Sequence, residues 1–417
     1  MLLRARGVLP VSSPLIEDGA VAVAGGQIQA VGGWKSLRPH HHSGQVLDLG
    51  DTLLLPGLVN AHCHLDYTGL AGFLTQPRQF PDWIKQIVTA KSGWTYSDYA
   101  QSWLNGAKML LRRGVTTVAD IEAVPELLPE VWETTPLRVI SFLELLNVRS
   151  WHSAGQIVQE AEQKLDSLPH AEGRVGLSPH APYSTSPDLL RHAASTARRR
   201  GWPLTTHVAE SREELDMFAH RRGTLFEWLS TQRDVSECGL DSPVRYLARQ
   251  GLLGPDFLAV HANYLAEGDA PLLGGHGASV VHCPRSHAFF RHERFPLETL
   301  LGEGVNVCLG TDSLASTTQR RREPLELDMF AEMRALAAST PELSAESILR
   351  LATVNGARAL HREGQIGELA VGACADLIAI PWKGRKANAH EVVLSHQGDV
   401  TVSMIAGLWA VPPPPQP

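Results

Sequence analysis

Eight short apolar runs lie between residues 53 and 314, and stretches with helical spacing of their apolar positions separate them. The helical spacing is clear in Tyr99–Arg113, Ile157–Leu168, Pro187–Arg200 and Glu214–Leu229. Eight alternating β and α units predict an α/β fold that closes into a parallel (β/α)8 barrel, the TIM-barrel architecture. The predicted strands are Leu54–His64, Thr116–Glu122, Leu137–Leu145, Arg174–His180, Pro203–His207, Phe257–His261, Ala278–Cys283 and Val305–Asp312.

Both ends of the chain show strand-like alternation broken by glycine, without long helical periods. The alternation is visible in Ala20–Val31 near the start, and in Asp376–Pro381 and Val400–Gly407 near the end. The 417 residues are enough for one barrel and a smaller domain. We therefore expect a small composite β-sandwich domain, residues 1–54 and 362–417, beside a barrel of residues 55–361.

Charge and cysteine usage narrow the function class. The net charge of −7 comes from 37 basic and 44 acidic residues that are spread along the chain, so we expect a small-molecule substrate and neither nucleic-acid nor membrane partners. Met1–Ser13 contains arginines but no long apolar run or small-residue cleavage site, so we expect a protein that is not exported. The cysteines are odd in number and form no C-x-x-C pair, which argues against a disulfide framework and a thiolate zinc site. We predict a cytoplasmic protein and leave a homo-oligomer open; the cysteines are Cys63, Cys238, Cys283, Cys308 and Cys374.

Residues with ligand-type side chains stand at the ends of the predicted strands. His62 and His64 are two positions apart at the end of the first strand, so both imidazoles face the same side and can reach one metal ion. An H-x-H pair alone is weak, because two buried or exposed histidines give the same pattern. In a barrel, however, the C-terminal strand ends converge on one site. Later strands end with His180, His207, His261 and Asp312, and His282 lies near the end of the seventh.

Several segments resemble known motifs. The stretch Leu55–His64 resembles the first-strand signature of the amidohydrolase superfamily. The chain also resembles one branch of that superfamily over nearly its whole length. This branch contains cytosine, guanine and adenosine-type deaminases and chlorohydrolases, and it includes methylthioadenosine/S-adenosylhomocysteine deaminase-like proteins. The further segments that carry this resemblance are Gly114–Asp120, Ser178–Tyr183, His207–Glu210, Gly310–Asp312, Asn355–Ala357 and Gly367–Leu377.

The resemblance implies a metal centre. It implies that His62, His64, His207 and Asp312 hold one divalent ion, zinc or alternatively iron, and leave a position for water. Two-metal members of the superfamily use a modified lysine after the third or fourth strand. Neither predicted strand contains a lysine here, so we expect a single metal.

The resemblance also implies catalytic roles for Glu210, His261 and Asp312. Glu210 would shuttle protons, although a glutamate at a helix N-terminus gives the same pattern. His261 would orient or polarise the attacked centre, and the alternative is a core histidine. Asp312 would take a proton from the attacking water.

Four residues are candidate substrate contacts. His180 resembles a substrate-binding histidine of adenosine-type deaminases. Arg285 and His287 stand where that branch more often has Pro-x-Ser-Asn; Arg285 could pair with a carboxylate or phosphate, or lie in a solvated loop. Trp83 could stack on a flat ring or pack against the outer wall of the barrel.

The predicted reaction is hydrolytic deamination of an aminated heterocycle, with an adenine nucleoside-like substrate such as adenosine, methylthioadenosine, S-adenosylhomocysteine or aminofutalosine. Guanine, cytosine or pterin deamination, hydrolytic dechlorination and cyclic amide hydrolysis are alternatives, because pocket shape sets the choice. A non-catalytic barrel protein is an alternative of another class, and it would carry no stoichiometric metal.

Overall fold

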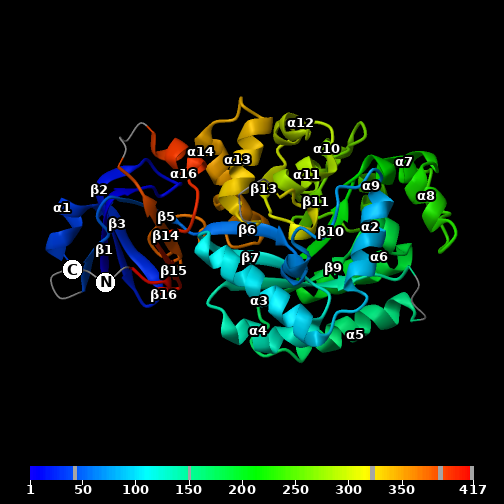
Figure 1. The fold of residues 1–417 in the computed structure, drawn as a ribbon, viewed down its shortest axis with the longest axis horizontal. Helices are drawn as coiled ribbons and strands as arrows, with labels where there is room; N and C mark the ends of the chain where they lie inside the picture. Colours follow the sequence, from blue (N-terminus) through cyan, green and yellow to red (C-terminus); the bar gives the residue numbers. More distant parts are fainter. Residues whose placement is uncertain (41–44, 149–151, 320–324, 384–387, 414–417) are drawn as a thin grey trace.

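A computed structural model describes residues 1–40, 45–148, 152–319, 325–383 and 388–413. Eight parallel strands pair in chain order, and helices surround them (Figure 1). This arrangement confirms the (β/α)8 barrel. The strands are β6 (Leu58–Cys63), β7 (Val115–Glu122), β8 (Arg138–Leu145), β9 (Val175–Pro179), β10 (Leu204–Val208), β11 (Phe257–His261), β12 (Ser279–His282) and β13 (Asn306–Leu309).

The barrel closes between β6 and β13, its first and last strands. The backbone N–H of His64 donates to the Asp312 carbonyl at 3.2 Å, and the N–H of Asp312 donates to the His62 carbonyl at 3.1 Å. Gly310 allows this close approach, because a Cβ there would lie 2.8 Å from the His62 carbonyl oxygen. The seam that closes the barrel therefore also brings His62, His64 and Asp312 together.

Replacing Gly310 by alanine is expected to lower the free energy of unfolding by about 1–3 kcal/mol, because the added methyl would push β13 away from β6. Gly275→Ala is the matched control, since nothing lies within 4 Å of a Cβ at that position. Chemical denaturation of both variants measures the effect. Equal midpoints for Gly310→Ala and the wild type would show that the seam tolerates a side chain.

Helices cover the outside of the barrel. Good caps start several of them: Thr95 with Asp98 and Ser153 with Gln156 form capping boxes. The α-helices are α2 (Phe80–Lys91), α3 (Tyr96–Arg112), α4 (Leu128–Thr134), α5 (Ala154–Asp166), α6 (Pro187–Arg200), α7 (Arg212–His220), α8 (Thr224–Leu229), α9 (Pro243–Arg249), α10 (Asp269–Gly275), α11 (Pro284–Phe290), α12 (Leu297–Gly302), α13 (Met329–Ser339), α14 (Ala345–Leu351) and α15 (Val354–Ala359). Short 3₁₀ turns are η2 (Leu65–Leu70), η3 (Pro125–Leu127), η4 (Pro182–Ser184) and η5 (Leu314–Ser316).

Two predicted elements are divided in the structure. The helix predicted over Glu214–Leu229 is α7 and α8, because Arg221 and Gly223 adopt φ values of 53° and 92°, which end a right-handed helix. The strand predicted over Leu54–His64 is also two strands. The break is at Gly57, where a Cβ would lie 2.0 Å from Oγ1 of Thr116.

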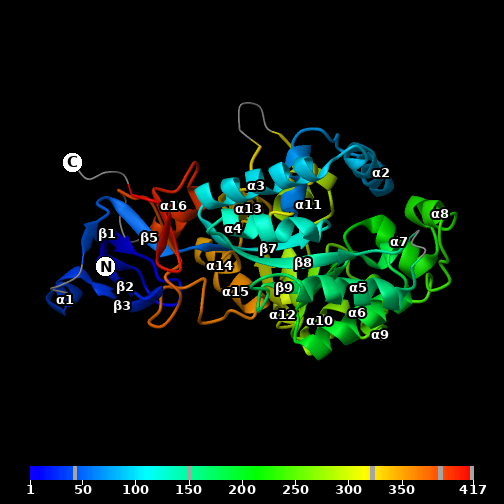
Figure 2. The same cartoon turned by 90° about the horizontal axis from the view of Figure 1, so that it is seen from below.

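A second sheet is built from both ends of the chain, as predicted (Figure 2). Its strand order is β16-β15-β14-β5-β1-β2-β3, with β4 beside β1. The domain boundaries given above stay a prediction; the chain leaves this sheet with β5 and enters the barrel with β6. The elements are β1 (Leu2–Val8), β2 (Ile16–Ala24), β3 (Gln27–Gly33), α1 (Trp34–Leu37), η1 (Arg38–His40), β4 (Val46–Asp48), β5 (Thr52–Pro56), β14 (Leu377–Pro381), α16 (Ala389–Ser395), β15 (Val402–Ile405) and β16 (Leu408–Val411).

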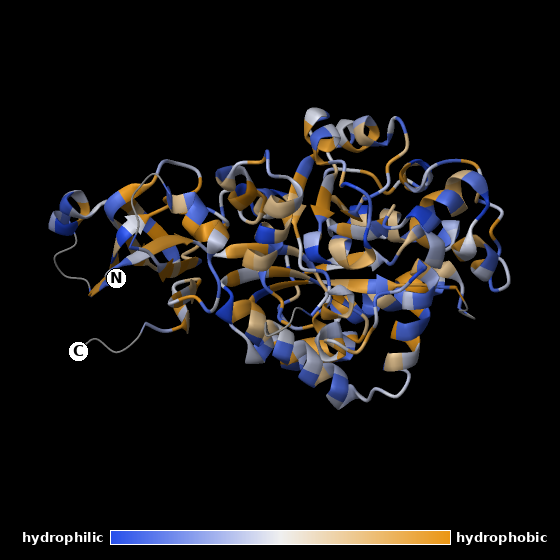
Figure 3. Cartoon of the chain, turned by 45° about the horizontal axis from the view of Figure 1, so that its top comes forward, coloured by the Kyte–Doolittle hydropathy of each residue, from blue (hydrophilic) through white to orange (hydrophobic). Residues whose placement is uncertain are grey.

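Apolar side chains fill the barrel and join it to the terminal sheet. Strands carry mostly hydrophobic residues, and the helices present hydrophilic residues outward (Figure 3). Val59, Phe142 and Val260 belong to the cluster inside the barrel. Ile378 and Val400 of the terminal part pack into the larger cluster that includes the barrel helices. Among the described residues, no helix is both long and apolar enough to cross a membrane.

Candidate active site

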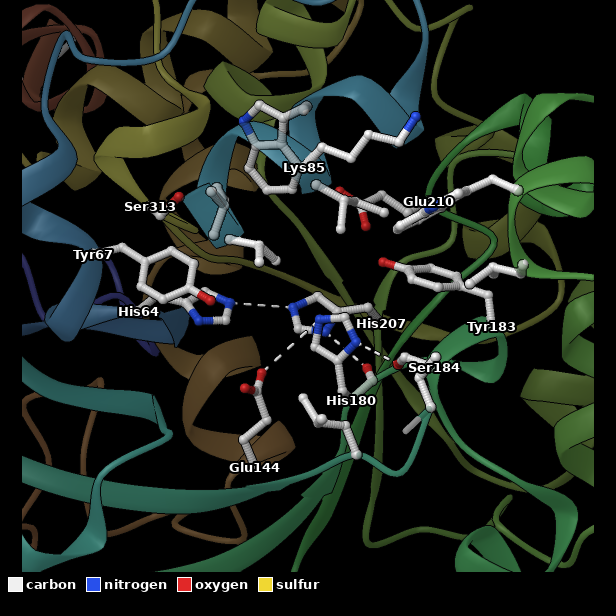
Figure 4. Close-up of a pocket in the computed structure, with 18 of the residues that line it drawn as sticks. His64, Tyr67, Lys85, Glu144, His180, Tyr183, Ser184, His207, Glu210 and Ser313 are labelled. Carbon is white, nitrogen blue, oxygen red and sulfur yellow. Dashed lines mark hydrogen bonds and ion pairs between the residues drawn. The ribbon is translucent and has the colours of Figure 1, made fainter. Parts of the chain in front are cut away.

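A cavity of about 500 Å³ opens at the C-terminal ends of the barrel strands (Figure 4). This size lies in the range of small-molecule sites. Its floor is polar and its walls are mostly apolar. The lining residues are His64, Tyr67, Trp83, Ile84, Lys85, Ile87, Val88, Thr89, Glu144, Leu146, Val148, His180, Tyr183, Ser184, His207, Glu210, Trp228, Leu229, Gln232, His261, Asp312 and Ser313.

Four buried side chains with metal-ligand atoms converge at this end of the barrel: His64, His207 and Asp312 line the cavity, and His62 lies beside them. Nε2 of His64 lies 3.2 Å from Nε2 of His207. Oδ1 of Asp312 lies 3.6 Å from Nε2 of His62 and 3.8 Å from Nε2 of His64. The ligand atoms of His62, His64 and His207 all lie within 4.8 Å of one another, as do those of His62, His261 and Asp312.

The ligand atoms of these four residues suit a divalent cation. Among the described residues, neither ring nitrogen of the buried His62 has a hydrogen-bond partner, which is costly unless a ligand engages the ring. Nδ1 of His207 lies 2.8 Å from the carbonyl oxygen of His180. Because a carbonyl only accepts, this nitrogen carries the proton, and Nε2 turns its lone pair to the centre of the group. Imidazole nitrogens with one carboxylate suit zinc and also suit iron.

The electrostatics keep these side chains in their ligand forms. Burial lowers the pKa of His64 and His207 well below the ordinary value, so both rings are neutral. Burial alone would raise the pKa of Asp312, but the imidazoles of His62 and His261 hold it well below its usual range. Neutral imidazoles and an ionised carboxylate are the forms that bind metal.

Glu210 and His261 lie together beside the four donors. Oε1 of Glu210 is 3.6 Å from Nε2 of His261, and both side chains are almost fully buried. Burial, with the negative charges of Asp312 and Glu214, raises the pKa of Glu210 well above its usual value. Burial lowers the pKa of His261 to about 3. The pair therefore combines a carboxyl group that can donate a proton with a neutral imidazole.

Backbone contacts fix the position of Glu210. Its N–H donates to Oε2 of Glu214 at 2.9 Å, and its carbonyl accepts from the side-chain amide of Asn263 at 2.9 Å. His261 and Asp312 have positive φ values of 75° and 52°. Such backbone conformations are costly for residues with a side chain and cluster at functional sites.

Comparison with known proteins agrees with this geometry. A model of the amidohydrolase family matches residues 53–410. This chain belongs to the amidohydrolase family. The resemblance seen in its motifs is thereby confirmed.

Relatives of this amidohydrolase include named deaminases. A 5-methylthioadenosine/S-adenosylhomocysteine deaminase of Syntrophobacter fumaroxidans is 32% identical over 417 residues, which cover 94% of this chain and 87% of the relative. A 5′-deoxyadenosine deaminase of Methanosarcina barkeri is 29% identical over 409 residues, with 94% and 88% covered. The solved structure of an adenosine deaminase from Xanthomonas campestris with bound zinc is 26% identical, covers 98% of this chain and 92% of its own, and has a TM-score of 0.81.

In the structure of this chain, the four residues predicted to contact the substrate fall into two pairs. His180 and Trp83 line the cavity. Arg285 and His287 are not among the described residues that line the cavity. Arg285 lies on α11, where its guanidinium donates to the Glu326 carbonyl at 2.8 Å and its backbone N–H donates to Oε2 of Glu332 at 2.8 Å. These contacts turn Arg285 toward α13 and away from the cavity.

Glu332→Gln is expected to make the protein more stable at pH 8 than the wild type, by up to about 4 kcal/mol, and nearly equal to it at pH 5. Burial raises the pKa of Glu332 to about 8, from 4.5. Between these two values the unfolded chain has lost the proton and the folded chain retains it, so the wild type loses stability as pH rises. Glutamine can still accept from Arg285. Thermal unfolding at both pH values measures the difference; a pH-independent difference would contradict the shift.

The structure adds supporting residues that sequence reasoning missed. Asp120 accepts from the backbone N–H of Leu65 at 3.0 Å and from the indole of Trp103 at 2.8 Å, which fixes the segment after His64. Ser316 donates to Oδ2 of Asp312 at 2.8 Å. Asp120 lies near the end of the second predicted strand and closes the segment Gly114–Asp120 that carries the resemblance, but neither signal gave it a role. Tyr67, Glu144, Tyr183 and Trp228 also line the cavity.

Proposed function

We propose that this amidohydrolase catalyses the hydrolytic deamination of an adenine nucleoside whose 5′ carbon carries an apolar group in place of the hydroxyl. The main support is one cavity that combines four converging ligand atoms, a buried proton donor and apolar walls. The relatives named above act, by their names, on methylthioadenosine, S-adenosylhomocysteine and 5′-deoxyadenosine. In all three the 5′ carbon bears a hydrogen or an apolar thioether in place of the hydroxyl, and the thioether of S-adenosylhomocysteine continues into a charged amino acid. The zinc-bound structure is named for adenosine, which keeps the 5′ hydroxyl.

We propose that His62, His64, His207 and Asp312 hold one zinc ion. Their converging nitrogen and oxygen atoms support a single ion, as does the zinc named with the adenosine deaminase structure. A cation held there would lower the pKa of water from about 16 toward about 7 and provide the nucleophile for hydrolysis at neutral pH.

Glu210, Asp312 and His261 would then divide the proton transfers. Asp312 accepts a proton from the attacking water, and Glu210 donates one to the ring nitrogen beside the amino-bearing carbon, which makes that carbon more electrophilic. The water oxygen bonds to the carbon, and His261 stabilises the negative charge that develops on this oxygen. Glu210 then carries the proton of the new hydroxyl to the amino group, so the carbon–nitrogen bond breaks, ammonia leaves and the ring keeps the oxygen as a carbonyl. The proton held by Asp312 returns to Glu210, which restores both carboxyl groups.

The outer walls of the cavity favour an apolar substituent on the substrate. Ile84, Ile87 and Val88 of α2 face the cavity together with Leu146 and residues of α8. Val88 is 64% exposed and Leu146 is 50% exposed. An apolar 5′ group would cover these side chains and remove them from water, which stabilises the complex.

The test is release of ammonia and chloride by the zinc-loaded protein from a panel of substrates. The panel contains methylthioadenosine, S-adenosylhomocysteine, 5′-deoxyadenosine, aminofutalosine, adenosine, guanine, cytosine, a pterin and a chlorotriazine. We expect ammonia from the 5′-modified adenine nucleosides, with kcat/KM about 10-fold or more above that for adenosine. Ammonia from guanine, cytosine or pterin alone, or chloride alone, would contradict the proposal.

We further propose a cytoplasmic location, which the five unpaired cysteines support. Assembly into a homo-oligomer is a proposal that size-exclusion chromatography with light scattering would test.

A further inference from the structure

Glu144 is a buried carboxylate of the cavity that the proposed reaction does not use. Its side chain is 8% exposed, and Oε1 is buried without a hydrogen-bond partner among the described residues. The imidazole Nε2 of His180 lies 3.9 Å from Oε1, beyond hydrogen-bond distance, and burial lowers the pKa of this histidine, so the ring is neutral. A buried acceptor without a donor destabilises the free protein, so a donor supplied by a ligand would be favoured there.

The register of β8 directs this carboxylate to the substrate. Side chains two positions apart in a strand face the same side. Ile140 and Phe142 belong to the cluster inside the barrel, so Glu144, two residues further, rises from the interior at the strand end. In Figure 4 it points toward His180, on the other side of the histidines from Glu210.

Several other polar lining groups of the cavity already have partners. Ser184 Oγ lies 2.6 Å from Nδ1 of His180. The hydroxyl of Thr89 donates to the carbonyl of Lys85 at 2.8 Å, and Nζ of Lys85 lies 3.6 Å from Asp82. Glu144 differs from them because it offers lone pairs to a ligand without giving up an existing hydrogen bond.

We infer that Glu144 accepts hydrogen bonds from the sugar hydroxyls of the substrate and selects ribonucleosides over their dideoxy counterparts. This inference rests on the proposed function. The nucleosides named for the relatives share a ribose with 2′ and 3′ hydroxyls. Adenosine keeps a 5′ hydroxyl and the others lack it, so the diol is the hydroxyl donor pair common to all of them. A carboxylate accepts from two hydroxyls at once, and bonds to a charged acceptor are the stronger kind.

The test compares adenosine with 2′,3′-dideoxyadenosine as substrates of the zinc-loaded wild type, Glu144→Leu and Glu298→Leu. Glu298 is the matched control, because its side chain is 72% exposed on α12. We expect the wild type and the control to prefer adenosine by about 10- to 100-fold in kcat/KM. Glu144→Leu should lose that preference, with kcat/KM for adenosine lowered and that for dideoxyadenosine nearly unchanged.

Two results would overturn the inference alone: Glu144→Leu keeps the preference of the wild type, or it lowers kcat/KM equally for both nucleosides. If Glu144→Leu fails to fold, as judged by its Tm, Glu144→Gln replaces it and should lower the preference in the same direction. A wild type that releases no ammonia from any adenine nucleoside would overturn the proposed function and this inference together.

Discussion

Replacing Glu210 by glutamine is expected to lower kcat for ammonia release by about 10²- to 10⁴-fold while the protein retains its zinc. The carboxyl group lies beside His261, and burial keeps its pKa raised, so it is suited to donate a proton that an amide cannot supply. Glu210 is not one of the four residues proposed to hold zinc, so its replacement should leave metal binding intact. Steady-state ammonia release and metal analysis of the same sample measure both effects.

Glu227→Gln is the matched control for this substitution. Glu227 is exposed on α8 and does not line the cavity, so the control should keep wild-type turnover. Wild-type turnover in Glu210→Gln would contradict the assignment of the proton shuttle. Loss of zinc from Glu210→Gln would instead indicate a structural role for this carboxylate.

Replacing His64 by alanine is expected to weaken zinc binding by at least about 100-fold and to abolish ammonia release with it. His64 brings Nε2 to 3.2 Å from Nε2 of His207 and 3.8 Å from Oδ1 of Asp312, so its loss opens the group of donors on one side. Metal analysis after dialysis against a weak chelator measures retention.

His276→Ala serves as the control, because His276 is exposed at the C-terminal cap of α10 and lies outside the cavity lining. It should retain zinc and turnover. Stoichiometric zinc in His64→Ala would show that the ion is held elsewhere. Full turnover without zinc would contradict the metal-dependent reaction itself.

The period of the strands and the barrel topology explain why so much of the site could be predicted. His62 and His64 face one side of a strand because they are two residues apart, and parallel strands in a barrel bring their ends to one place. The same reasoning predicted that His207, His261 and Asp312 lie at the same site. The structure gathers these residues as the strand pattern requires.

Other features depend on contacts that the sequence does not display. Gly310 allows β13 to approach β6 only because the two strands meet across the barrel seam. The direction of Arg285 depends on Glu326 and Glu332, which are far away in the chain. Glu144 had a readable signal, a charged residue at an inward position of a buried strand, but that signal required the register of β8 to be known.

The most direct test of the central claim is to let the zinc-loaded protein act on methylthioadenosine in water labelled with oxygen-18, and to measure label in the purine together with ammonia. The account predicts a purine that carries the label at the carbon that bore the amino group, with equal amounts of labelled product and ammonia. An unlabelled product, or a substrate that stays unchanged while zinc is bound, would contradict hydrolytic deamination.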